Sequence, residues 1–154
     1  MKTNRGTIRR VHPDEIERLS SLIRNTLLIS NSLDYDMRII QNLSRQYSPG
    51  YLRDLALRRH MYVHLTGDTI DGTISLKGDA IYAFFVAPDK QREGIGSRLL
   101  TFVEELARTT GIRRLKVDAS VTARAFYEHH GYRALRKERD YSYGAVFFMQ
   151  KDLV

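Results

Sequence analysis

Gln91, Gly94 and Gly96 form a Gln-x-x-Gly-x-Gly turn, which is the part of this sequence best suited to bind a phosphate group. The two glycines let the backbone approach a ligand closely and adopt positive φ angles. The helix expected after the turn begins with N–H groups that have no acceptor within the helix and carry partial positive charge. A pyrophosphate would satisfy these groups, so the sequence predicts an anion-binding cradle here.

The elements on either side would position the turn between a buried strand and a helix. Residues 81–86, IYAFFV, are apolar on both alternating faces, which predicts a central strand that Pro88 ends. Downstream, Gly111 stands where a helix cap is expected. The apolar residues between them recur at helical spacing: Ile95, Leu99, Phe102, Val103 and Leu106.

Taken alone, the Gly94-Ile95-Gly96 tripeptide is also explained by a tight turn that binds nothing. No Gly-Lys-Ser/Thr follows, which excludes a Walker loop, and the third glycine of a dinucleotide-binding fingerprint is missing. The wider context is more specific. QREGIG with its preceding strand, together with SVTARAFYEHHGY at residues 120–132, resembles the acetyl-coenzyme A signature of the GNAT superfamily of N-acetyltransferases.

The remaining chain predicts a single domain over residues 1–154, since its length suits one hydrophobic core. Strands are expected at 7–11, 61–65, 69–76, 81–86, 114–118, 133–136 and 145–150. Helices are expected after Pro13, over a stretch with Met37, Ile40 and Leu43 inward, after Gly94 and at 121–130, and residues 51–57 add a further helical turn. This order resembles an α/β GNAT domain with a mixed, mostly antiparallel sheet of six to seven strands, about four helices and a splayed parallel strand pair at the cofactor site.

Charge and composition narrow the function classes. The net charge is +7, and residues 90–139 carry twelve Lys and Arg against six Asp and Glu, so most of the excess surrounds the motif. This field would attract a polyanionic cofactor or nucleic acid, or simply aid solubility. The absence of cysteine excludes thiol nucleophiles and disulfides. With no apolar run long enough for a membrane span, we expect a soluble, cytoplasmic protein with no membrane or nucleic-acid partner.

The resemblance implies that acetyl-coenzyme A is the cofactor and that its pantetheine arm lies between the splayed strands. Backbone N–H groups of the turn would surround the pyrophosphate, with Gln91 closing the turn and a hydroxyl available from Ser97. Arg92 and Arg98 would lie near the phosphates or in solvent. The cofactor-binding residues expected by position are Phe85, Val86, Gln91, Arg92, Glu93, Gly94, Ile95, Gly96, Ser97, Ser120 and Tyr127.

Tyr127 is the expected catalytic side chain. Phe126 and Tyr127 are adjacent on a helix and so lie about 100° apart around its axis, which lets one pack while the other faces a cleft. In the resembled family a tyrosine at this place stands by the cofactor sulfur and can protonate the departing thiolate. The alternative is a tyrosine that only packs or hydrogen-bonds the sulfur.

The resemblance implies direct transfer, in which a neutral amine attacks the thioester and a backbone N–H near Val86 stabilises the oxyanion. The residue that takes the ammonium proton is unassigned, because Ala80 stands where histone-acetylating members have a glutamate and Asp79 falls in the preceding turn. Bound water is one alternative. Ser120 stands where many members have asparagine, which leaves its contact to the pantetheine arm open.

The acceptor is a small-molecule or protein primary amine that the sequence does not identify, and an acyl group other than acetyl also remains open. His129 and His130 diverge on a helix with no third ligand, so no metal site is expected. A homodimer is compatible with the family. Residues expected near the acceptor, each also explained by ordinary turn or strand chemistry, are Asn31, Asp34, Tyr35, Tyr82, Phe84, Tyr141 and Tyr143.

Two other functions compete with the enzyme hypothesis. A non-catalytic acyl-coenzyme A binding module would keep the cradle without turnover, and Ala80 is its best support. A basic nucleic-acid-binding domain would bind strands in a strongly salt-dependent way, although no recognition-helix or RNA-binding aromatic pattern supports it.

Overall fold

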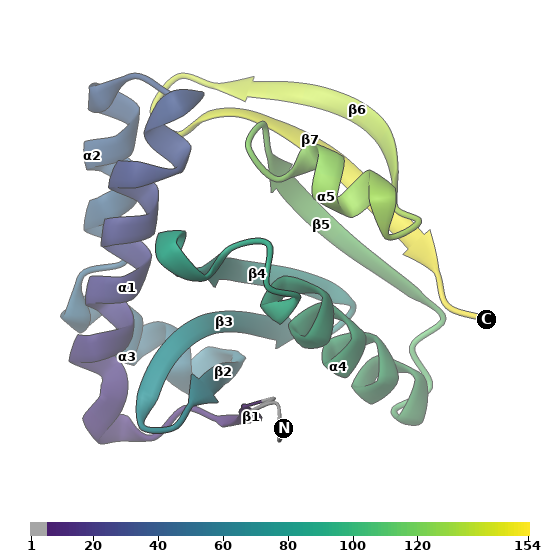
Figure 1. Ribbon diagram of the computed structural model, residues 1–154. Helices are drawn as coiled ribbons and strands as arrows, with labels where there is room; N and C mark the ends of the chain where they lie inside the picture. The colour runs from purple at the N-terminus through teal and green to yellow at the C-terminus, as the bar shows by residue number, and fades with distance from the viewer. Residues whose placement is uncertain (1–5) are drawn as a thin grey trace.

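Seven strands form one mixed sheet in the computed structural model, which describes residues 6–154 (Figure 1). The spatial order is β1-β2-β3-β4-β5-β7-β6; β4 and β5 pair in parallel, and the other neighbours pair antiparallel. The strands are β1 (Thr7–Arg10), β2 (His60–Thr66), β3 (Thr69–Lys77), β4 (Ala80–Val86), β5 (Arg114–Ser120), β6 (Arg133–Asp140) and β7 (Gly144–Asp152). The predicted mixed sheet is confirmed.

Helices cover both faces of this sheet. Neighbouring residues of a strand point to opposite faces, so apolar residues on both faces need helices to bury them. Along β2, Met61 and Val63 join a core with the first three helices, whereas Tyr62 joins a second core with the last two. No helix within residues 6–154 is long and apolar enough to cross a lipid bilayer. The α-helices are α1 (Ile16–Ile29), α2 (Met37–Gln46), α3 (Pro49–Arg58), α4 (Ile95–Thr109) and α5 (Arg124–His129).

Several predicted boundaries were wrong in detail. The described residues contain five α-helices rather than about four, because the turn expected at 51–57 belongs to a ten-residue helix with Pro49 in its first turn. Met37 is 51% exposed rather than inward, since it opens α2 while Ile40 carries the buried face. The helix α5 is shorter than predicted, because residues 121–123 form a turn before it.

The closing hairpin is longer than the sequence pattern indicated. Strand β6 continues past Arg136 to Asp140, and β7 runs from Gly144 to Asp152. Every residue of β6 is exposed at the edge of the sheet, so its second half carries charges instead of an apolar alternation. Such charges are typical of edge strands, where they discourage pairing with other chains.

Candidate active site

The parallel strands β4 and β5 separate after only two paired positions, Ala80 with Lys116 and Ile81 with Val117 (Figure 1). Strand β5 stays paired with β7 as far as Ser120, so from residue 82 onward one edge of β4 has no neighbouring strand among residues 6–154. We call this opening the fork. Its edge offers backbone N–H and C=O groups to an extended ligand, as a missing strand would.

A bulge in β4 marks the point where the fork opens. Against β3, Ser75 pairs with Tyr82 and Thr73 with Phe85, so β4 contains one extra residue there. Ala83 has a φ of 47°, a left-handed conformation that is uncommon for a residue with a side chain. Bulges bend a strand and redirect its side chains, and the bend here turns β4 away from β5.

The end of β4 points its backbone toward the fork. The Val86 carbonyl accepts a 3.1 Å hydrogen bond from Gln91 Nε2, whereas the next N–H, of Ala87, donates to Asp71 of β3. Because the N–H and C=O of one strand residue point to the same side, the Val86 N–H also faces away from β3. Gln91 Nε2 also donates to Ser30 Oγ at 3.1 Å, so Gln91 closes the turn as predicted and ties it to the end of α1.

The predicted cradle is built from left-handed backbone conformations at the start of α4. Arg92 has a φ of 67° and Gly94 a φ of 86°, and Gly94 is the N-cap of the helix. No side chain within the described part of the chain caps α4. The first hydrogen bond of the helix runs from Arg98 N to Gly94 O at 3.1 Å. The N–H groups of Ile95, Gly96 and Ser97 therefore remain for a ligand, and a fifteen-residue helix adds its dipole.

Gly96 lies where there is no room for a side chain. A Cβ placed on it would lie 3.3 Å from the Phe126 ring of α5 and 3.7 Å from a Val86 methyl. Gly94 has open space around it and instead provides the positive φ. The two glycines thus meet different requirements, one of close packing and one of backbone conformation.

Ser97 and His130 form a hydrogen-bonded pair beside the cradle. His130 Nδ1 lies 2.8 Å from the Phe126 carbonyl, which can only accept, so Nδ1 carries the hydrogen. His130 Nε2 then accepts from the Ser97 hydroxyl at 2.9 Å. The backbone of Ser97 lies at the cradle, while its hydroxyl hydrogen is donated to His130 Nε2. The His129 and His130 rings lie at 76° to each other, which fits the expected divergence.

Tyr127 is buried at 3% exposure within an aromatic cluster beside β4. Its ring packs edge-to-face on Phe84 at 6.0 Å, Phe126 at 5.7 Å and Tyr132 at 5.3 Å. Burial raises the pKa of the Tyr127 phenol far above its usual range, so the hydroxyl keeps its proton at any physiological pH. Within residues 6–154 no protein group forms a hydrogen bond to this hydroxyl, unlike that of Tyr132, which donates to Glu104 at 2.8 Å.

A buried network, which the sequence did not reveal, anchors the first turn of α4. Arg98 Nη2 donates to His64 Nε2 at 3.1 Å, and His64 Nδ1 donates to Asp71 Oδ1 at 2.5 Å. Since a guanidinium only donates, His64 is neutral with its hydrogen on Nδ1. Asp71 also accepts from Thr66 Oγ1 at 2.6 Å and is the extra residue of a bulge between β2 and β3.

The second face of the fork is bordered by loops that the sequence assigned to the acceptor. Tyr35 is buried; its hydroxyl donates to the Ala145 carbonyl at 2.6 Å and accepts from Val121 N at 2.8 Å. Asp34 accepts from Thr122 Oγ1 at 2.8 Å. The structure therefore brings residues 31–35 to the end of β5 and the start of β7, where the Tyr35 hydroxyl is already bonded to protein groups.

The hairpin between β6 and β7 meets α2 at the same border. Arg38 Nη2 donates to the Tyr141 carbonyl at 2.8 Å and its guanidinium stacks 4.5 Å above the Tyr141 ring, which is 83% exposed. Asn42 donates to the Ser142 carbonyl at 2.9 Å. Tyr143, at 39% exposure, completes the hairpin, and Asn31 is buried in the loop before α2, where its carbonyl closes a turn.

The predicted residues of β4 divide between the two faces of the sheet. Phe84 joins the aromatic cluster with Phe126 and Tyr127, whereas Phe85 packs on Tyr47 on the opposite side. Tyr82 lies on the same side as Phe85, with the Arg59 guanidinium 4.2 Å above its ring. Ser120 ends β5, and its hydroxyl accepts from Ala123 N at 3.1 Å to shape the turn into α5.

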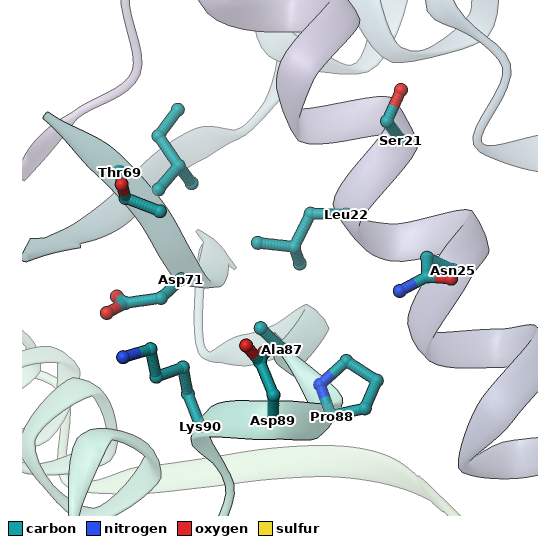
Figure 2. A pocket seen from close by; sticks show the side chains of 10 residues that line it. Ser21, Leu22, Asn25, Thr69, Asp71, Ala87, Pro88, Asp89 and Lys90 are labelled. Carbon is teal, nitrogen blue, oxygen red and sulfur yellow. The ribbon is translucent and has the colours of Figure 1, made fainter.

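A hollow of about 370 Å³ lies between α1 and the segment that follows β4 (Figure 2). Figure 2 shows the Leu22 side chain reaching from α1 toward β3, above Ala87 and Pro88. None of the predicted cofactor-binding residues lines this hollow, which is separate from the fork. Its walls are Ser21, Leu22, Asn25, Thr69, Ile70, Asp71, Ala87, Pro88, Asp89 and Lys90.

A protein-family model described as an acetyltransferase (GNAT) domain matches residues 39–153. The chain belongs to the GNAT family. This match spans the fork, the cradle and the aromatic cluster, and it confirms both the resemblance and acetyl-coenzyme A as the cofactor. YafP of Escherichia coli K12, described as an uncharacterised N-acetyltransferase, is 26% identical over 144 residues, covering 94% of this chain and 92% of YafP.

Solved structures show the same GNAT fold over almost the whole chain. A GCN5-related N-acetyltransferase from Rhodopseudomonas palustris has a TM-score of 0.92 at 22% identity, with 99% of each chain covered. The PaiA N-acetyltransferase from Thermoplasma acidophilum, solved with coenzyme A, has a TM-score of 0.81 at 21% identity, with 95% of this chain and 98% of that one covered. At these identities the likeness establishes the fold.

Proposed function

We propose that this GNAT protein transfers an acetyl group from acetyl-coenzyme A to a primary amine, by direct attack within a ternary complex. The cradle at the start of α4 would hold the pyrophosphate through N–H groups of residues 92–97. The pantetheine arm would pair with the free edge of β4, which leads from Val86 into the fork. The fit rests on backbone groups that have no protein partner among the described residues 6–154, and on Gly96, whose missing Cβ leaves room for Phe126 and Val86 beside the cradle.

The acetyl transfer itself would need two contributions from the fork. The amine nitrogen forms a bond to the thioester carbon, and the carbon–sulfur bond breaks. The Val86 N–H, on the fork side of β4, would stabilise the charge that develops on the carbonyl oxygen. The Tyr127 hydroxyl, which burial keeps protonated, would donate its proton to the departing thiolate and would regain one as the new amide nitrogen loses its extra proton. No acyl-enzyme is required.

One observation carries this proposal more than any other: the free edge of β4 and the uncapped end of α4 meet at residues 86–97. A ligand with both a pyrophosphate and an amide-bearing arm satisfies the two together. A non-catalytic acyl-coenzyme A module would use the same groups, but it would not need a buried tyrosine hydroxyl without a protein partner beside the fork. The acceptor would be a small molecule or a protein amine.

Thiol release from acetyl-coenzyme A, measured with a panel of aliphatic, aromatic, polycationic and peptide primary amines, tests the proposal. We expect acetyl-coenzyme A to bind at micromolar concentrations and at least one amine to release thiol. Rates measured at varied concentrations of both substrates should give the intersecting pattern of a ternary complex. Binding without release by any amine would favour the non-catalytic module, and parallel lines would contradict direct attack.

A further inference from the structure

Asp118 and Tyr82 occupy the point where the two strands of the fork part. Ile81 and Val117 form the last registered pair of β4 and β5, and both are buried against the core that contains α4. Since side chains alternate along a strand, the next residues, Tyr82 and Asp118, lie on the opposite face. This is the face of the first three helices, away from Tyr127 and its aromatic cluster.

Asp118 is an exposed carboxylate with no ion pair or hydrogen bond to any other residue within 6–154. The charged residues nearest to it along the sheet have partners of their own. Lys116, two residues earlier on β5, pairs with Asp79 at 3.2 Å. Arg136, across β7 on β6, pairs with Glu138 at 3.1 Å. The Asp118 carboxylate is thus free to meet a cation from outside the chain.

The surroundings of Asp118 favour proton uptake more than those of a fully exposed carboxylate. Partial burial and the nearby Glu138 raise the pKa of Asp118, while Arg136 opposes this change. On β4, Tyr82 faces the same side with Arg59 stacked on its ring, and Lys116 lies on the same strand. A carboxylate with a raised pKa accepts a proton from an ammonium group more readily than an ordinary one.

We propose that Asp118 is the general base that takes the proton from the acceptor ammonium before attack. The inference rests on the proposed acetyl transfer and assigns a group that the transfer requires. The ammonium nitrogen loses one proton to an Asp118 oxygen, which leaves a neutral amine with a lone pair and a neutral carboxylic acid; solvent then removes this proton. Ala80 carries no titratable group at the corresponding end of β4, so β5 supplies the carboxylate across the fork.

Asp118→Asn tests this role, with Asp152→Asn as a control carboxylate at the other end of the β5–β7 pairing. The probe is the panel amine that the wild-type protein acetylates fastest. For Asp118→Asn we expect kcat/KM for the amine to fall on the order of 100-fold at pH 7. The KM for acetyl-coenzyme A should stay unchanged. The deficit should shrink as the pH approaches the pKa of the amine, because more of the amine is then already neutral.

Asp152→Asn should keep its turnover within a few-fold of wild type, since its carboxylate pairs with Arg114 at 2.6 Å, at the end of β5 away from the fork. Asp118→Asn with wild-type kcat, or with a deficit that is equal at every pH, would overturn the assignment of Asp118. A deficit confined to the KM of the amine would overturn it too, because Asp118 would then only bind the cation. If the wild-type protein acetylates no amine, the proposed function fails first.

Discussion

The two sides of the fork are built in different ways. On the side proposed for the donor, the cradle and the edge of β4 present backbone groups, and their placement depends on Gly94, Gly96 and a bulge at Ala83. On the side proposed for the acceptor, the border depends on side chains that join segments about a hundred residues apart, such as Tyr35 with Ala145 and Asn42 with Ser142. Backbone recognition suits a constant donor, whereas side chains can change with the acceptor.

The two sides of the fork should respond differently to substitution. The donor side should tolerate exchange of exposed side chains but not the addition of a Cβ in the wrong place. The acceptor side should respond to loss of single hydroxyl or amide groups without any change in donor affinity. Substitutions on each side therefore test whether the two sides act independently.

Gly96→Val should have the largest effect. Its branched side chain would meet Phe126 and Val86, where even a Cβ lies at 3.3 Å and 3.7 Å. We expect the Kd for acetyl-coenzyme A to rise on the order of 1,000-fold, which corresponds to about 4 kcal/mol. Calorimetric titration measures this, with Gly50→Val on α3 as the control because nothing lies within 4 Å of a Cβ there. Equal affinities would show that the cradle does not hold the donor.

Asp71→Ala should lower the free energy of unfolding by about 3 kcal/mol, because it leaves the buried His64 Nδ1–H without its acceptor and removes the far end of the chain that holds Arg98. Chemical denaturation measures the change. Asp68→Ala, in the exposed turn between β2 and β3, is the matched control and should change stability by less than about 0.5 kcal/mol. A stable Asp71→Ala protein would mean that the network does not support the donor side.

Tyr127→Phe should lower kcat about 100-fold while leaving the Kd of acetyl-coenzyme A unchanged, since only the proton donor is lost. Tyr132→Phe offers a contrast within the same aromatic cluster: it removes the hydrogen bond to Glu104 and should lower the melting temperature while folded protein keeps its turnover. Steady-state rates and thermal melts separate the two. If Tyr127→Phe keeps the wild-type kcat, the Tyr127 hydroxyl is not the proton donor and the side chain only packs.

Tyr35→Phe should have the smallest effect, a loss of about 1 kcal/mol in stability, because one hydroxyl then no longer joins Val121 and Ala145. We also expect a raised KM for the amine with unchanged affinity for acetyl-coenzyme A. Tyr51→Phe, at an exposed position on α3, is the control. Donor affinity that fell together with amine affinity would show that the two sides are not independent.

The same contrast explains which parts of the site the sequence predicted. The apolar run at 81–86, the glycines and the helical spacing after them are local patterns, so the strand, the cradle turn and the helix were all predicted from neighbouring residues. The Asp71–His64–Arg98 network joins three elements through a β-bulge, and no local pattern reports a bulge.

Asp118 shows the same limit on the other side of the fork. The sequence shows an aspartate at this position, but its proposed role depends on two features of the fold. The pairing of β5 with β4 ends at Val117, and the next residue, Asp118, turns to the opposite face of the sheet. Phe84 is similar: the bulge at Ala83 turns it into the aromatic cluster with Tyr127 rather than toward the side of Tyr82. Periodicity predicts alternation, but it does not predict where a bulge interrupts it.

Backbone amide chemical shifts, followed while the wild-type protein is titrated with acetyl-coenzyme A, test whether the cradle and the fork bind the cofactor. We expect the largest changes at residues 92–97 and 82–86, with small changes at residues 21–25 and 69–71 around the separate hollow. Changes concentrated at that hollow, or no changes at the start of α4, would contradict this expectation.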